Sequence, residues 1–510
     1  MSHIKAEIRE NPPGFPPFLT IESEYVRVLS FPLKVIRDPA GRYCAGKRQQ
    51  ERAAAMAEKR VKKPAGVQND AAIDMTTGSV QGALVRFTIP IFIGNLFQQL
   101  YNAVDSLIVG NFVGSTALAA VSSTGTLLFM LVGFFYGVAM GGGVIIARYI
   151  GARDDVNTEI AVHTQVAIGL IGSVILTAVG VIFTPAMLRL MDTPDDVLPQ
   201  AILYLRIYFA GIVGMVMYNI FVGIMQAAGD SRHPLYYLIF SSLLNIVLDL
   251  VFILVFGAGV AGAAFATIIS QIISAILCFV RLVRLDDTYR VVPRRVRLDR
   301  PTAAAIIKVG IPSGVQNSAQ GLSNVVIQSY INGYGSAAMA GIGAYIKVEG
   351  FGMLPLTSFA LAISTYVSQN LGAQKRDRVD RGVRFGVIAG MIMLQAIGVV
   401  IYIFAPQLIG LFNSDPEVIY YGVGRARVGT IFFFLFAYTQ MMSSVLRGCK
   451  HAMEPMVVFL VTWCAFRIAF MAIGSMFNSS VALIYWVFPI SWAISSVVLF
   501  FIWRRVRKTL

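Results

Sequence analysis

Two acidic residues stand inside apolar stretches of this sequence, where a charged side chain is costly. Asp105 lies within IPIFIGNLFQQLYNAVDSLIVG, and Asp249 lies within NIVLDLVFI. A carboxylate in a membrane-spanning helix is unfavourable unless it faces a cavity, pairs with another group or takes up a proton, so such acids mark functional sites by default. The structural alternative is a helix cap at Asp105 and a hydrogen bond from Asp249 to a neighbour.

Neutral oxygen atoms accompany the second acid. Asn245 precedes Asp249 by one helical turn on the same face, and Thr267 follows in AGAAFATIIS. Two carboxylates with neutral oxygens suit a hard cation such as Na⁺. Two neighbouring carboxyl groups can also share a proton. These residue types therefore allow a site for either Na⁺ or H⁺.

The composition identifies the elements that must position these residues. The chain has 510 residues, of which 56% are hydrophobic and 14% charged, and its mean hydropathy is +0.69. Apolar runs of about 20 residues recur, which is the length that crosses a hydrocarbon core as a helix. We predict an all-α polytopic membrane protein with a lipid bilayer around it. Its twelve transmembrane helices begin near residues 83, 116, 159, 197, 234, 259, 302, 337, 381, 418, 453 and 481.

Positive charges alternate between the two sides of these spans. Segment 281–300 alone carries seven Arg, whereas the loops on the opposite side hold one basic residue, Arg189. Basic loops remain in the cytoplasm, so both termini are expected there, in a multi-pass plasma-membrane protein. The same distribution explains the net charge of +15 without a nucleic-acid partner.

The chain repeats itself at an offset of 222 and then 221 residues. Ile89-Pro90 matches Ile311-Pro312, and NFVGSTALAA matches NGYGSAAMAG. Each half holds six spans, so the halves are expected to be parallel and related by a pseudo-two-fold axis along the membrane normal. The predicted parts are an N-lobe at 75–284, a basic cytoplasmic linker at 285–300 and a C-lobe at 301–510. Two such lobes with a cleft between them are typical of a transporter that rocks.

Residues 1–74 do not belong to this pattern. They are rich in Lys, Arg and Pro and show no clear periodicity. We interpret them as a disordered basic extension that is not translated, with Met75 as the natural start. The alternative is a real cytoplasmic tail.

Several segments together resemble the multidrug and toxic compound extrusion (MATE) family across about residues 75–510. They are IPIFIGNLFQQLYNAVDSLIVG, NIVLDLVFI, QAAGDSRHP after the fourth span, and the GAR and GAQ turns after the second and eighth spans. The resemblance implies a monomeric antiporter, not an enzyme, that exports cationic amphipathic drugs or toxic compounds in exchange for Na⁺ or H⁺ without a cofactor. It also implies that Asp105, Asn245, Asp249 and Thr267 form the cation-coupling site.

The first span contains further candidates. Pro90 precedes Asp105 in the same helix, and the resemblance implies that the helix bends there when the acid changes charge. An ordinary packing kink is the alternative, since Pro312 repeats it. Three residues are expected to line the Asp105 face as part of a substrate cleft: Gln98, Tyr101 and Asn102.

The second lobe departs from the first. The repeat places Ile327, Phe466 and Phe470 where the first lobe has Asp105, Asn245 and Asp249, so the cation site is not duplicated. Glu349 in the eighth span is a candidate for attracting a cationic substrate. It could equally pair with an arginine of the same lobe, and the candidates are Arg425, Arg427 and Arg467.

Three other classes compete with a drug exporter. A flippase of lipid-linked sugars or polysaccharide precursors has related architecture, but it should show several Arg along its cleft. A membrane-embedded enzyme is disfavoured because the four His form no HExxH and no GxSxG or GxxxxGK(S/T) motif occurs. A channel is disfavoured by the duplicated architecture and by the absence of a pore-loop sequence.

Overall fold

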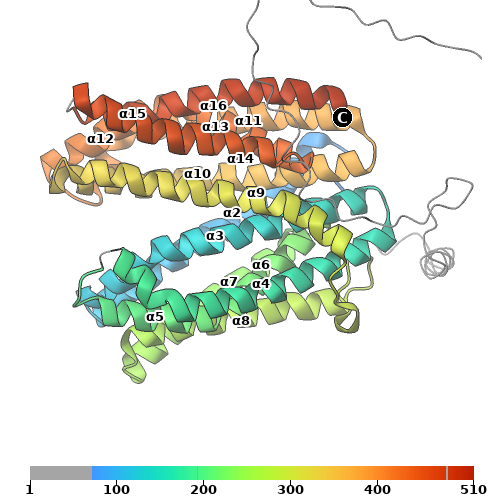
Figure 1. Ribbon diagram of the computed structural model, residues 1–510, viewed down its shortest axis with the longest axis horizontal. Helices are drawn as coiled ribbons and strands as arrows, with labels where there is room; N and C mark the ends of the chain where they lie inside the picture. The colour runs from blue at the N-terminus through green and yellow to red at the C-terminus, as the bar shows by residue number, and fades with distance from the viewer. Residues whose placement is uncertain (1–71, 192, 478–479) are drawn as a thin grey trace, which may run out of the picture. The chain divides into compact units, whose positions relative to one another are not determined.

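The computed structural model describes residues 72–191, 193–477 and 480–510, all within the unit Gly66–Leu510. These residues form helices joined by short loops, and the only strand-like pairing among them is an isolated bridge between Ala72 and Asp230. The predicted all-α class is therefore confirmed (Figure 1). Most of the predicted extension, residues 1–71, lies outside the described part of the chain.

The N-lobe is built from seven α-helices, shown in blue to yellow-green in Figure 1. They are α2 (Val80–Phe112), α3 (Ser115–Gly151), α4 (Asp155–Leu190), α5 (Leu198–Ala210), α6 (Ile212–Ala227), α7 (Arg232–Leu250) and α8 (Gly259–Arg284). A π-helical turn, Val251–Val255, continues α7 directly.

The C-lobe follows a linker that contains a 3-10 turn at Pro293–Arg295. Its helices are α9 (Arg300–Asn332), α10 (Ser336–Gly372), α11 (Arg376–Gly410), α12 (Pro416–Ile431), α13 (Phe433–Gly448), α14 (Met453–Phe459), α15 (Phe466–Phe477) and α16 (Ala482–Thr509). A second π-helical segment, Leu460–Ala465, joins α14 to α15.

Nine described helices are long and apolar enough to cross a membrane, or up to eleven if each of two bent pairs counts as one span. The remaining predicted span is α9, which carries Gln316, Asn317 and Gln320 along its length. It packs closely along α3, so protein rather than lipid surrounds much of its surface. The helices thus account for all twelve predicted segments.

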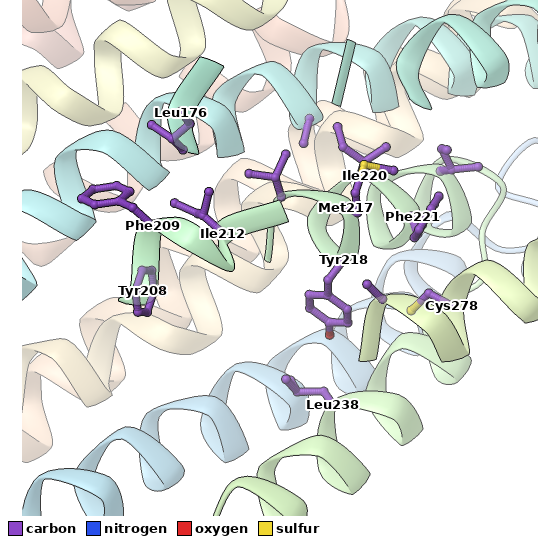
Figure 2. Close-up of a cluster of buried hydrophobic side chains, with 14 of the residues drawn as sticks. Leu176, Tyr208, Phe209, Ile212, Met217, Tyr218, Ile220, Phe221, Leu238 and Cys278 are labelled. Atoms are coloured by element: carbon purple, nitrogen blue, oxygen red, sulfur yellow. The ribbon is translucent and has the colours of Figure 1, made fainter. Parts of the chain in front are cut away.

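Two predicted spans are bent, which the sequence reading missed. The chain turns by 49° between α5 and α6 and by 58° between α12 and α13, at the repeat-related residues Gly211 and Phe432. A side chain at Gly211 would lie 2.2 Å from Ile268, so the bend lets this backbone press against α8. Figure 2 shows Phe209 and Ile212 beside the bend, within the apolar core of the N-lobe.

Two of the seams between the lobes are related by the repeat but unlike in character. At the α3–α9 seam, a Cβ atom added at Gly137 would lie 2.1 Å from the backbone nitrogen of Gly314, so the backbones touch there. At the repeat-related α2–α10 seam, Asn95 donates a hydrogen bond to Ser358 at 2.9 Å. The first seam is tight and glycine-lined, and the second contains polar side chains.

The linker packs against α4. The backbone N–H of Val292 donates to Nε2 of His163 at 2.9 Å, and Arg295 forms an ion pair with Glu159 at 2.6 Å. These contacts hold the arginine-rich segment against the end of the N-lobe.

Candidate functional site

A pair of carboxyl groups lies between α2 and α7. Asp105 of α2 and Asp249 of α7 come within hydrogen-bonding reach of each other. Asp249 is fully buried, and in each acid the Oδ1 atom is buried without a hydrogen-bond partner. The ion pairs of the described residues give neither acid a Lys, Arg or His partner. Because an uncompensated buried charge is costly, this pair favours taking up a proton or a cation.

Asn245 and Thr267 extend the pair toward α8. With its amide nitrogen facing the acid, Asn245 donates to Oδ2 of Asp249 at 3.3 Å and accepts from the backbone N–H of Thr267 at 3.3 Å. The Thr267 hydroxyl donates to the carbonyl of Ala263 at 3.0 Å, as a helical threonine commonly does. The structure therefore brings Asp105, Asn245, Asp249 and Thr267 together from three helices.

The donor set limits which cation this cluster could hold. Within the described part of the chain, no group of three or more His, Cys, Asp or Glu is arranged to hold a metal ion. Two carboxyl groups with amide and hydroxyl oxygens suit a weakly bound hard cation or a shared proton better than a transition metal.

The backbone changes form beside the acid pair. Helix α7 ends at Leu250 and continues as the π-helical turn Val251–Val255, immediately after Asp249. A π-helical turn adds a residue to one turn and is frequent at functional sites. No residue type in NIVLDLVFI signals this widening, so sequence reasoning missed it.

Further polar groups surround the pair. Tyr101, one turn before Asp105, interacts with Gln271 of α8 and with both carboxyl groups, and Tyr204 of α5 lies within their electrostatic reach. Gln271 is buried, and its Oε1 atom has no hydrogen-bond partner. It follows Thr267 by four residues on the same helical face, and this spacing could have revealed it. Tyr204 left no comparable signal.

A cavity opens two turns along α2 from the acid pair. Pro90 and Gln98 line it, together with Tyr218 of α6 and Ser364 and Thr365 of α10. The cavity therefore lies between the lobes, at the α2–α10 seam. Its wall contains amide and hydroxyl groups, and none of its lining residues is Asp, Glu, Lys or Arg.

Of the four predicted cleft residues, Gln98 alone lines this cavity, and Tyr101 lies beside the acid pair instead. Asn102 is exposed and does not line the cavity. Glu349 of α10 accepts a hydrogen bond from Tyr345 at 3.1 Å and likewise does not line it. Among the described ion pairs Glu349 has no partner, so it forms no salt bridge with the arginines considered for it.

Comparisons with known proteins agree with this architecture. The family model MatE matches residues 90–251 and again residues 312–473, in register with the internal repeat. The probable multidrug resistance protein YoeA of Bacillus subtilis is 28% identical and covers 84% of this chain and 96% of its own. YpnP of the same organism, also a probable multidrug resistance protein, is 30% identical over 79% of this chain and 90% of its own.

A solved structure shares the fold as well. The outward-facing conformation of a multidrug resistance MATE family transporter superposes with a TM-score of 0.80 at 24% identity, covering 87% of this chain and 99% of that one. Relatives of this kind are transporters rather than enzymes, as the sequence led us to expect. This chain, a multi-pass membrane protein with the matched module in each half, belongs to the multidrug and toxic compound extrusion family.

Proposed function

We propose that the protein is a secondary antiporter that exports cationic amphipathic compounds in exchange for Na⁺ or H⁺. The observation that carries the proposal is the pair of half-buried Asp105 and fully buried Asp249, in which each acid has a buried oxygen without a protein partner and neither has a basic partner among the described ion pairs. An exchanger needs a group whose ion binding favours one conformation over another. Two carboxyl groups held together repel each other when both are charged, and an added cation or proton removes that repulsion.

Helix α2 links this pair to the cavity. Asp105 and Gln98 lie on the same helix two turns apart, about 10 Å, and Pro90 lies further along it. Pro90 supplies no backbone N–H, so the helix can bend there at low cost. We infer that neutralising Asp105 shifts α2 and changes the shape of the cavity at Gln98.

The cavity must widen before a drug enters. Its volume is about 110 Å³, below the roughly 300–1,000 Å³ of small-molecule sites. The polar α2–α10 seam is the side where the lobes can separate, because the glycine-lined α3–α9 seam is closely packed. The wall offers aromatic rings and amide oxygens to an amphipathic cation, and we expect it to select by shape more than by charge.

The same wall disfavours the flippase alternative. A transporter of lipid-linked sugars or polysaccharide precursors would need cationic groups for the anionic phosphates. None of the residues that line the cavity is Arg or Lys. We further propose that the protein works as a monomer in the plasma membrane, with both termini and the Arg284–Arg300 segment on the cytoplasmic side.

The decisive experiment measures efflux of a fluorescent cationic dye from vesicles that contain the purified full chain, under an imposed Na⁺ or H⁺ gradient. Asp105→Asn should reduce gradient-driven efflux at least about tenfold while dye binding persists, because the neutral amide removes the switch. Asp105→Glu should keep part of the activity. Asp195→Asn, at an exposed loop acid, is the matched control.

An Asp105→Asn protein whose efflux still responds normally when the gradient is collapsed would contradict the proposal. Asp105 would then be a structural acid at its helix position.

A further inference from the structure

A second buried charged cluster lies in the C-lobe. Arg425 of α12 and Arg467 of α15 are 2% and 1% exposed. Both guanidinium groups lie against the ring of Phe488, at 4.0 Å and 4.6 Å from its centroid. Two like charges thus converge on one aromatic side chain in the interior of the lobe.

The hydrogen-bonding capacity of these arginines is only partly used. Nε of Arg467 donates to Ser491 at 2.9 Å, and Nη1 lies 3.5 Å from the Ser323 hydroxyl. Nη2 of Arg467 and Nη1 of Arg425 are buried without a partner. A guanidinium group carries five N–H donors and no acceptor, so these unpaired nitrogens call for an electron-rich partner.

The charge of the cluster is also unbalanced. The acid that acts on it is Glu349, whose carboxylate accepts from Tyr345 and makes no salt bridge with either arginine among the described ion pairs. Aromatic rings stabilise the guanidinium groups, with Trp463 4.7 Å from Arg467 and Tyr345 5.1 Å from Arg425. Such contacts lower the cost of burial but cancel no charge. Two cations and one anion leave a net charge of +1.

In the internal repeat, this cluster corresponds to the region around the acid pair of the N-lobe. At the offset of 221, Arg425 corresponds to Tyr204 and Phe488 to Thr267, and at 222 Ser323 corresponds to Tyr101. All three N-lobe residues belong to the surroundings of Asp105 and Asp249. The corresponding regions of the two lobes therefore have opposite electrostatic character, although the charged residues themselves occupy different repeat positions.

We propose that the C-lobe binds one monovalent inorganic anion of the size of chloride between Arg425 and Arg467. The anion accepts from Nη1 of Arg425 and Nη2 of Arg467 and neutralises the net charge of the cluster. Small-residue and aromatic neighbours supply no competing acceptor at these two nitrogens. The proposal goes beyond the export function and does not depend on which cation is coupled.

Thermal unfolding of the purified full chain tests the site. The Tm is measured in increasing NaCl against sodium gluconate, with Na⁺ and ionic strength held equal so that cation binding contributes equally. Wild type should show a saturable rise in Tm with chloride, on the order of 2 °C. Arg425→Gln and Arg467→Gln should lose this rise, and Arg427→Gln, at an exposed arginine of the same helix, should keep it.

Bromide supplies a direct readout on the unaltered protein, because it quenches indole fluorescence on contact. Trp463 lies beside Arg467, so bound bromide should add a saturable component to the linear collisional quenching of exposed tryptophans. This measurement decides the question even if the arginine variants do not fold.

Equal Tm values in chloride and gluconate, together with purely linear bromide quenching, would overturn the proposal. The aromatic and serine contacts would then suffice for both arginines. A chloride effect that persists in both Arg425→Gln and Arg467→Gln would likewise overturn it, because the anion would bind elsewhere.

Discussion

The two lobes share a helical plan but carry opposite charges in corresponding regions of their interiors. In the N-lobe, Asp105 and Asp249 meet with unpartnered oxygens, and in the C-lobe Arg425 and Arg467 meet with unpartnered nitrogens. Phe466 and Phe470 lie against each other in a tilted arrangement, with ring centroids 5.7 Å apart, where the N-lobe has Asn245 and Asp249. Duplication of a fold therefore preserved the helices and left each interior free to acquire its own ligand chemistry.

The backbone near each cluster departs from the α-helix in a related way. A π-helical turn begins two residues after Asp249, and another ends two residues before Arg467. Such turns are frequent at functional sites, which fits a role for both regions. The difference between the lobes thus lies in the side chains, and substitutions can test it.

The largest expected effect is at the acid pair. Asp249→Asn should lower gradient-driven dye efflux at least about tenfold, and adding Asp105→Asn should lower it little further, because the two acids act as a unit. The matched change in the other lobe is Phe470→Leu, which should leave coupling intact. Efflux from vesicles measures all three variants. Loss of coupling in the Phe470→Leu protein would contradict the proposal that ion coupling is confined to the N-lobe.

A smaller, graded effect should follow at the neutral ligands. Asn245→Ala removes the donor to Asp249 and the acceptor for Thr267, so efflux should fall several-fold. Thr267→Ala removes one hydroxyl, which already donates to the carbonyl of Ala263, so efflux should fall only about twofold. Thr267→Ser is the control that keeps the hydroxyl. Efflux rates measured at a fixed gradient rank the three variants by their loss of activity. An equal loss of efflux in all three would argue against a cluster in which each residue is a separate ligand.

Much of this architecture follows from local patterns. Apolar runs predicted the spans, the repeat predicted the two matched halves, and acids in apolar surroundings indicated Asp105 and Asp249. A charged residue within an apolar run can be recognised from the sequence alone, because the hydrophobicity of a segment depends only on the residues next to one another in the chain. The position of Asn245 one turn before Asp249 is likewise local.

Features set by packing between distant segments left no such trace. Gly211 at the bend packs against Ile268 of α8, and Arg425 and Arg467, which lie on two different helices, both contact Phe488 of a third. Glu349 illustrates the same limit. Its charge suggested a salt bridge with an arginine, whereas the structure gives it a hydrogen bond from Tyr345. Periodicity identifies a buried face but not which residue of another helix fills it.

The smallest effect compares two serines that occupy the same position in the repeat. Ser491 of the C-lobe accepts from Nε of Arg467 at 2.9 Å, whereas Ser270 of the N-lobe is buried with a hydroxyl that has no partner. Ser491→Ala should destabilise the protein by about 1–2 kcal/mol because it leaves another buried donor of a charged group unpaired, and Ser270→Ala should change stability by about 0 kcal/mol. Thermal unfolding in gluconate and in chloride measures both variants. If the arginine cluster is held by its aromatic contacts alone, Ser491→Ala will behave like Ser270→Ala in both salts. If the serine positions Arg467 for the anion, Ser491→Ala will also reduce the chloride-dependent rise in Tm, and Ser270→Ala will leave that rise unchanged.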